Sequence, residues 1–355
     1  MHCQKIIMNT LKYVQTFKRY SYAVTNARLL NLRRNTFITF LPQIRKIEKH
    51  HNTNQWKNSS RNKIFIISGS FLFNLFSPKE EKDDVEELRT TIKRSILLIQ
   101  REEFPKAEQM LHIALRQAQM LQHYDGITYV YDVMANLAYD INNYKKAEQL
   151  FKSVLKRLLA KGVPQDDLAV VHISIKIADI YDKMGDTEKA NNGYKFCLQH
   201  LQNHLAKDCE NRDVLQLLGL SLEKYASMLF SQSDYINALK YFVQAYDISI
   251  KINGEENEQT VVLLNDLGSV NYMLEKYDQA IEYLSKAAKI GKNLPDMIDL
   301  GFIYINLGNT LIAKGLYEEA NKNCIEGERL AKTRGDNDSM IEAQKCLDKI
   351  KVLIH

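Results

Sequence analysis

The stretch that decides the fold is Leu264–Lys292, LNDLGSVNYMLEKYDQAIEYLSKAAKIGK. It predicts two amphipathic helices, because apolar or small residues recur at spacings of three and four on both sides of a break at Leu274–Lys276. The small residues Gly268, Ala280 and Ala287 stand where two helices must cross closely, with axes about 8–10 Å apart. Neither helix can bury its apolar stripe alone, so the pair needs neighbouring pairs.

Copies of this helix pair recur along the chain. The second helix of the pair recurs as six aligned sequence segments: FPKAEQML, YKKAEQLF, TEKANNGY, YINALKYF, YDQAIEYL and YEEANKNC. The shared small residue is Ala107, Ala147, Ala190, Ala238, Ala280 or Ala320. Three residues earlier stands an aromatic in five copies, with Thr187 as the exception. Four residues later stands Leu111, Phe151, Tyr194, Phe242, Leu284 or Cys324. One packing code in one register predicts an array of repeated helix pairs.

This code resembles the tetratricopeptide repeat, a helix–turn–helix unit with a period of about 34 residues. The spacings here are 40, 43, 48, 42 and 40 residues, which indicates longer helices or loops, as in the repeats of kinesin light chain. We therefore expect an all-α, right-handed solenoid of about six helix pairs over residues 82–335. Residues 336–355 are expected to form a capping helix that covers the last apolar face.

Two segments precede the array. Residues 1–63 carry thirteen lysines and arginines against one acid, Glu48, a net charge of +12, whereas the whole chain carries +5 and the remainder therefore −7. Written as a helix, this leader places Ile7, Leu11 and Phe17 on one face. A basic leader almost free of acids is typical of a mitochondrial targeting sequence, cleaved in part or whole; a basic tail without that role is the alternative. The acidic array is a poor candidate for binding nucleic acid.

The second segment is the apolar stretch at 64–76, IFIISGSFLFNLF. As a helix it spans roughly 20 Å, less than the roughly 30 Å of a hydrocarbon core. Its flanks are basic before and acidic after, which favours a membrane anchor or sorting signal with the array in the intermembrane space. The alternative is an apolar helix that packs on the first repeat.

The chain shows little sign of catalytic chemistry. It has no glycine-rich phosphate loop, no HExxH motif and no serine nucleophile elbow. The acid pairs Asp166–Asp167 and Glu255–Glu256 stand at expected helix starts, where they cap rather than catalyse. The five cysteines lie far apart, which argues against a zinc site or a disulfide framework. Cys197 and Cys324 fall at packing positions and are expected to be buried thiols. We expect a protein that is not an enzyme and that has no cofactor and no small-molecule substrate.

A concave face lined by the first helices is the candidate site for a protein partner. Its carboxylates favour a basic or amphipathic partner, and its amides pair with an extended peptide; each position is alternatively a solvated one. The groove residues predicted from the repeat register are Asp132, Asn136, Asp179, Asp182, Glu223, Asn265, Ser269 and Asn309.

The whole pattern resembles the mitochondrial tetratricopeptide repeat protein 19 family. The likeness lies in the AEQML and AEQLF helices, in IADIYDKMGDTEKA at 177–190 and in LGNTLIAKGLYEEA at 307–320. The resemblance implies a non-catalytic factor of the mitochondrial inner membrane that binds respiratory complex III, supports its assembly and upkeep, and helps to clear fragments of the Rieske subunit. Two other functions fit the repeats: a cargo adaptor similar to kinesin light chain, and a chaperone or import co-factor of a mitochondrial membrane.

Overall fold

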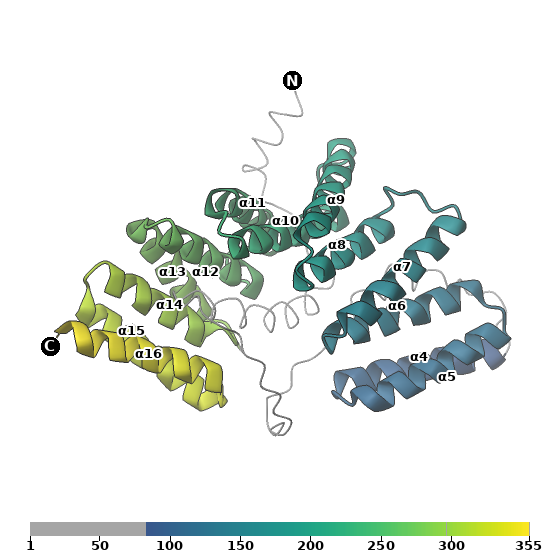
Figure 1. The fold of residues 1–355 in the computed structure, drawn as a ribbon, viewed down its shortest axis with the longest axis horizontal. Coiled ribbons are helices and arrows are strands. Elements are labelled where there is room, and N and C mark those ends of the chain that lie inside the picture. Colours follow the sequence, from purple (N-terminus) through teal and green to yellow (C-terminus); the bar gives the residue numbers. More distant parts are fainter. Residues whose placement is uncertain (1–82, 296, 355) are drawn as a thin grey trace. The chain divides into compact units, whose positions relative to one another are not determined.

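The computed structural model describes residues 83–295 and 297–354, so the leader at 1–63 and the apolar segment at 64–76 lie outside the described residues. Within that range the chain is all-α and contains thirteen helices (Figure 1). The helices are α4 (Asp83–Gln100), α5 (Phe104–Met120), α6 (Tyr124–Asp140), α7 (Tyr144–Ala160), α8 (Leu168–Lys183), α9 (Thr187–Lys207), α10 (Arg212–Ser231), α11 (Tyr235–Asn253), α12 (Glu258–Met273), α13 (Tyr277–Gly291), α14 (Leu300–Ala313), α15 (Tyr317–Arg334) and α16 (Asn337–Ile354).

The chain forms two compact units that divide inside α10, between Lys224 and Tyr225. In the first unit α4 packs on α5, α6 on α7 and α8 on α9; in the second α12 packs on α13, α14 on α15, and α15 on α16. Successive pairs also contact each other, as α5 does α6 and α13 does α14. This sequential pairing is the tetratricopeptide-like solenoid architecture that the repeat code predicts.

Close helix crossings occur where the code has small residues. All six aligned alanines are fully buried. The residue four positions later is fully buried in five repeats and, as Phe242, only 3% exposed in the other. The aromatic at the start of the second helix packs on an aromatic near the end of the first in three repeats. The ring centroids are 6.0 Å apart for Tyr139–Tyr144, 5.4 Å for Phe230–Tyr235 and 5.8 Å for Tyr272–Tyr277.

The turn inside each pair has one recurring shape. Two positions before the second helix begins stands a residue with positive φ, and the next residue is the N-cap. Examples of the positive-φ residue are Asn142 (φ 59°), Gly185 (φ 78°) and Ser233 (φ 64°). The following side chain, Asn143, Asp186 or Asp234, accepts a hydrogen bond from the backbone amide three residues further on. These caps satisfy amides that the helix itself leaves unpaired, and so they fix where each second helix begins.

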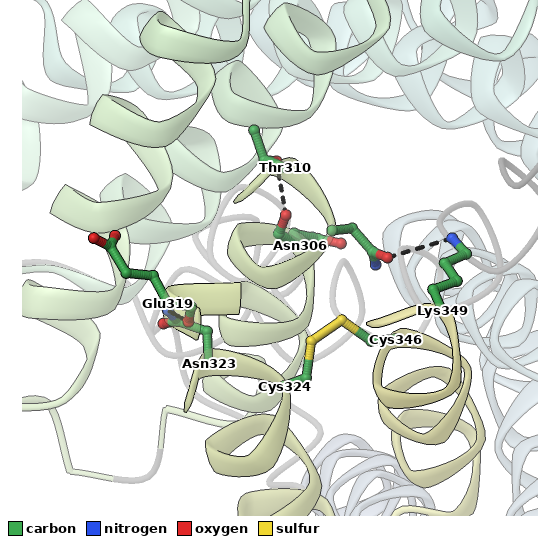
Figure 2. Close-up of a disulfide and its surroundings, with 8 residues drawn as sticks. Asn306, Thr310, Glu319, Asn323, Cys324, Cys346 and Lys349 are labelled. Atoms are coloured by element: carbon green, nitrogen blue, oxygen red, sulfur yellow. Dashed lines mark hydrogen bonds between the residues drawn. A yellow bond between two sulfur atoms is a disulfide. The ribbon is translucent and has the colours of Figure 1, made fainter. Parts of the chain in front are cut away.

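One prediction about the cysteines was wrong. Cys324 is buried as expected, yet it forms a disulfide with Cys346 that joins α15 to α16, with Cα atoms 6.0 Å apart (Figure 2). The sequence-based argument looked for cysteines close in the chain, whereas a single turn folds α16 back and brings residues 22 positions apart face to face. Cys197 is a buried free thiol, as predicted, and burial raises its pKa to about 12.

The last helix, α16, begins at Asn337, directly after an aspartate that caps its first turn. The Asp336 carboxylate accepts hydrogen bonds from the Ser339 amide at 3.3 Å and from its hydroxyl at 2.6 Å. Along α16 the side chains of Ala343 and Ile350 are buried, whereas that of Ile354, at the end of the helix, is 57% exposed. Among the described residues, no helix combines the length and the apolar character that a membrane crossing needs.

Candidate protein-interaction surface

Polar residues of the first helices are joined from one repeat to the next. In the first unit the Lys176 ammonium donates to Asn136 Oδ1 at 2.7 Å, and the Tyr139 hydroxyl donates to the Asp179 carboxylate. In the second unit Asn306 Nδ2 donates to Asn265 Oδ1 at 2.8 Å. Lys349 Nζ donates to Asn309 Oδ1 at 3.4 Å (Figure 2). We call these four pairs the inter-repeat ladder: Asn136–Lys176, Tyr139–Asp179, Asn265–Asn306 and Asn309–Lys349.

Asp179 is the one acid of this ladder, and it has further partners. Its carboxylate also accepts from the Tyr194 hydroxyl at 3.3 Å and lies 3.2 Å from the Lys224 ammonium. Burial raises the pKa of this carboxyl, but the charges of Lys224 and Lys183 and the hydrogen bond from Tyr139 outweigh it, so the pKa is lowered below its ordinary value. Asp179 therefore remains ionised and ties α6, α9 and α10 to α8.

Asp182 has a different environment, one turn away on α8. Its side chain is half-buried, and burial raises its pKa, with the neighbouring charge of Asp179 adding to the rise. The positive charges of Lys183 and Lys224 lower the pKa of Asp182 in part. A carboxylate that is partly desolvated and yet reachable gains from a cationic partner, since a nearby positive charge offsets the cost of burial.

The eight predicted groove residues divide by exposure. Those at least nine-tenths buried are Asp132, Asn136, Asp179, Glu223 and Ser269. The half-buried ones are Asp182, Asn265 and Asn309. Neither carboxylate oxygen of the buried Asp132 has a hydrogen-bond partner. The role of these residues in partner binding stays a prediction, and the half-buried three have the side-chain surface that a direct contact needs.

Sequence reasoning named only one residue of each ladder pair. The partners it missed are Tyr139, Lys176, Asn306 and Lys349. The available signal was the constant offset, because the paired residues lie 40 or 41 positions apart, close to the shortest repeat spacings.

Of the two acid pairs, Asp166–Asp167 lies at a helix start as predicted: Asp167 caps α8, its carboxylate accepting from the Ala169 amide at 2.8 Å. The pair Glu255–Glu256 precedes α12, which Asn257 caps, and the Glu255 carboxylate pairs with Lys286 at 3.3 Å. In the part of the chain that the structure describes, no three His, Cys, Asp or Glu side chains are grouped to hold a metal ion.

Solved structures show the same architecture. A Rap protein complexed with Competence and Sporulation Factor aligns over 81% of this chain and 82% of its own, with a TM-score of 0.51 and 17% identity. The tetratricopeptide repeat sensor protein PH0952 of Pyrococcus horikoshii aligns over 78% of this chain and 41% of its own, with a TM-score of 0.55 and 16% identity. At such identities the likeness concerns the fold alone.

The sequence comparisons identify the class and then the family. The tetratricopeptide repeat model matches residues 217–293, so the chain is a tetratricopeptide repeat protein. The mitochondrial tetratricopeptide repeat protein 19 homologue of Drosophila melanogaster is 40% identical over 299 residues, 84% of this chain and 81% of that protein. The human mitochondrial tetratricopeptide repeat protein 19 is 32% identical over 73% of this chain and 70% of its own. The chain belongs to the mitochondrial tetratricopeptide repeat protein 19 family.

Proposed function

We propose that this protein is a non-catalytic interaction protein of the mitochondrial inner membrane that supports the assembly and maintenance of respiratory complex III. It binds the complex, including the Rieske subunit, and aids the clearance of Rieske fragments. The observation that carries the proposal is the 40% identity to the Drosophila melanogaster homologue across 81% of that protein's length. The family resemblance supplies the partner.

The array supports this function through its polar first-helix residues. Side chains on successive helices of a solenoid line an extended surface, and tetratricopeptide arrays use such surfaces to hold protein partners. The half-buried Asp182 favours a cationic side chain, and the amides of Asn265 and Asn309 offer both donors and acceptors. These residues recognise a basic or amphipathic segment of complex III.

The test is affinity purification of the full chain from mitochondria, with identification of the co-eluting subunits. We expect complex III subunits, the Rieske protein among them. Co-elution of import chaperones or of cargo-transport proteins in place of complex III would overturn the proposal and favour one of the other two functions.

Variants then test the surface in each unit separately. Asp182→Lys in the first unit, and Asn265→Ala with Asn309→Ala in the second, should keep normal helicity by circular dichroism and lose complex III. Glu188→Lys, at an exposed position on α9, is the matched control and should retain it. Full retention of complex III by both surface variants would remove these residues from the mechanism. Asp179 is unsuitable for this test, because its replacement breaks the buried network.

A further inference from the structure

The sixth repeat departs from the packing code at one position. Where five repeats place a leucine or an aromatic, it places Cys324. In the fifth repeat that large residue is Leu284, and a Cβ at Gly268 would lie 2.4 Å from its Cγ. At the equivalent Gly308, a Cβ would lie 2.5 Å from Cys324 Sγ and 3.1 Å from Cys346 Sγ. Two sulfur atoms from two helices therefore occupy the space that one large side chain fills elsewhere.

The helix that supplies the second sulfur has little other apolar anchorage. The residues that α16 buries are Ser339, Glu342, Ala343, Cys346 and Ile350, of which Ile350 is the one large aliphatic, and Leu347 packs partly buried against the same cluster. By contrast, α14 buries Phe302, Ile303, Ile305, Leu307 and Leu311, among others. Since the stabilisation from burial scales with apolar area, the noncovalent hold on α16 is weak for a helix of 18 residues.

What α16 covers is apolar core and one polar ladder residue. Ala343, Cys346 and Ile350 belong to the same buried cluster as Leu307 and Leu311 of α14. Lys349 engages Asn309 at 3.4 Å. Lifting α16 would expose this part of the cluster and free the Asn309 amide.

We propose that Cys324 and Cys346 form a redox latch: their disulfide holds α16 on the last repeat, and its reduction releases the helix and uncovers Leu307, Leu311 and Asn309. The latch goes beyond complex III binding and does not depend on it. The disulfide closes a loop of 22 residues. A cross-link of that length stabilises the folded protein mainly by restricting the conformations of the unfolded chain.

The chemistry of the latch requires a partner disulfide. A thiolate of one cysteine attacks the disulfide of a protein thiol oxidoreductase, and the second cysteine then displaces that protein from the mixed disulfide. Two thiols of this chain become one disulfide, and the oxidoreductase leaves with two thiols, so electrons and protons balance. Cys324 is fully buried and Cys346 is 1% exposed. Oxidation therefore occurs while α16 is off the repeat. Reduction, in which the dithiol form of the oxidoreductase supplies the two electrons and two protons, needs a transient local opening of α16 around the intact bond.

The first test uses the full chain and an alkylating reagent under denaturing conditions without reductant, read by peptide mass spectrometry. Cys197, which is a free thiol in the structure, should be modified. Cys324 and Cys346 should be protected until a reductant is added. Complete modification of both in the unreduced chain would overturn the proposal.

The second test measures hydrogen exchange of the folded full chain before and after reduction. Backbone amides of α16 should exchange at least about tenfold faster once the bond is gone, while those of α12 and α13 stay unchanged. Cys346→Ala should reproduce the reduced pattern, and Cys209→Ala should behave as wild type. Equal protection of α16 in the oxidised and reduced chains would overturn the latch. The comparison of the oxidised and reduced chains uses the native sequence, so it tests the latch even if Cys346→Ala folds poorly.

Discussion

Gly268 shows how closely the two helices of one repeat approach. A Cβ built there would lie 2.4 Å from Leu284 Cγ, a branch atom in the middle of the side chain that cannot simply swing away. Gly301, in the first turn of α14, has its nearest neighbour at 3.5 Å from the same construction. Gly268 therefore has no room for a side chain, whereas Gly301 does, although both lie in first helices.

Gly268→Ala should destabilise the second unit by roughly 1–3 kcal/mol, because the added methyl overpacks the crossing. Gly301→Ala is the control and should be neutral or stabilising, since alanine favours helix by about 1 kcal/mol over glycine. Urea unfolding followed by circular dichroism measures both. Equal stability of the two variants would contradict the assigned crossing.

Asp179 makes the stability of the first unit sensitive to acid. Its lowered pKa means that the folded state holds the carboxylate more firmly than the unfolded state does. The stabilisation is complete at neutral pH and is lost as the pH falls below about 4 and through the folded pKa. Asp179→Asn should cost about 3 kcal/mol at neutral pH, since it leaves the Lys224 ammonium without its buried counter-charge.

The measurement compares urea unfolding at neutral pH and at about pH 3.5. The difference between wild type and Asp179→Asn should shrink at the lower pH, because the unfolded wild-type chain binds a proton at Asp179 more readily than the folded chain does. Glu188→Gln, at an exposed site, should follow wild type at both pH values. A gap between wild type and Asp179→Asn that is independent of pH would show that the charge of Asp179 is not what stabilises the unit.

Among whole elements, the second helices differ in how they begin. Asn143, Asp186 and Asp234 cap theirs, whereas Lys276 at the start of α13 makes no side-chain cap. The backbone at Lys276 has φ −86° and ψ 63°, close to the −86° and 74° of Asp186. The conformation that a capping side chain requires is thus already present.

Lys276→Asp should stabilise the second unit by about 1 kcal/mol, through a new hydrogen bond to a first-turn amide and a favourable charge at the helix N-terminus. Lys276→Ala separates these gains from the loss of the lysine and should change the free energy of unfolding by less than about 0.5 kcal/mol. Thermal unfolding of the two variants is the measurement, and an aspartate variant no more stable than the alanine variant would disprove the cap.

The sequence predicted the elements well because their causes are local. The break at Leu274–Lys276 lies between the end of α12 at Met273 and the start of α13 at Tyr277. Small residues at helix crossings leave a periodic trace that needs no knowledge of neighbours. The burial of Asp132 and Asp179 and the pairing of Cys324 with Cys346 depend on contacts between elements, which one sequence does not display.

At the scale of the whole protein, the leader at 1–63 is expected to carry the mitochondrial targeting signal. A chain lacking these residues should stay in the cytosol, because the basic, amphipathic import signal is removed. Fluorescence microscopy of tagged full-length and shortened chains measures this, and replacement of the leader by an unrelated mitochondrial presequence should restore import. Mitochondrial fluorescence of the shortened chain would contradict the assignment.

The apolar segment at 64–76 is expected to hold the mature protein at the membrane. Carbonate extraction of mitochondria should leave the native protein in the pellet. Replacement of Phe71, Leu72 and Phe73 by serine should release it. Release of the native protein by carbonate would instead favour a helix that packs on the first repeat.

The inter-repeat ladder has a consequence for inherited variation. Its pairs lie 40 or 41 residues apart, and each depends on the rotational phase of a first helix. An extra codon in a turn leaves that phase intact, whereas one inside α8 turns every later side chain of the helix by about 100° relative to its start. In-frame insertions of a single codon should therefore be harmless or damaging according to whether they shift the phase of a first helix.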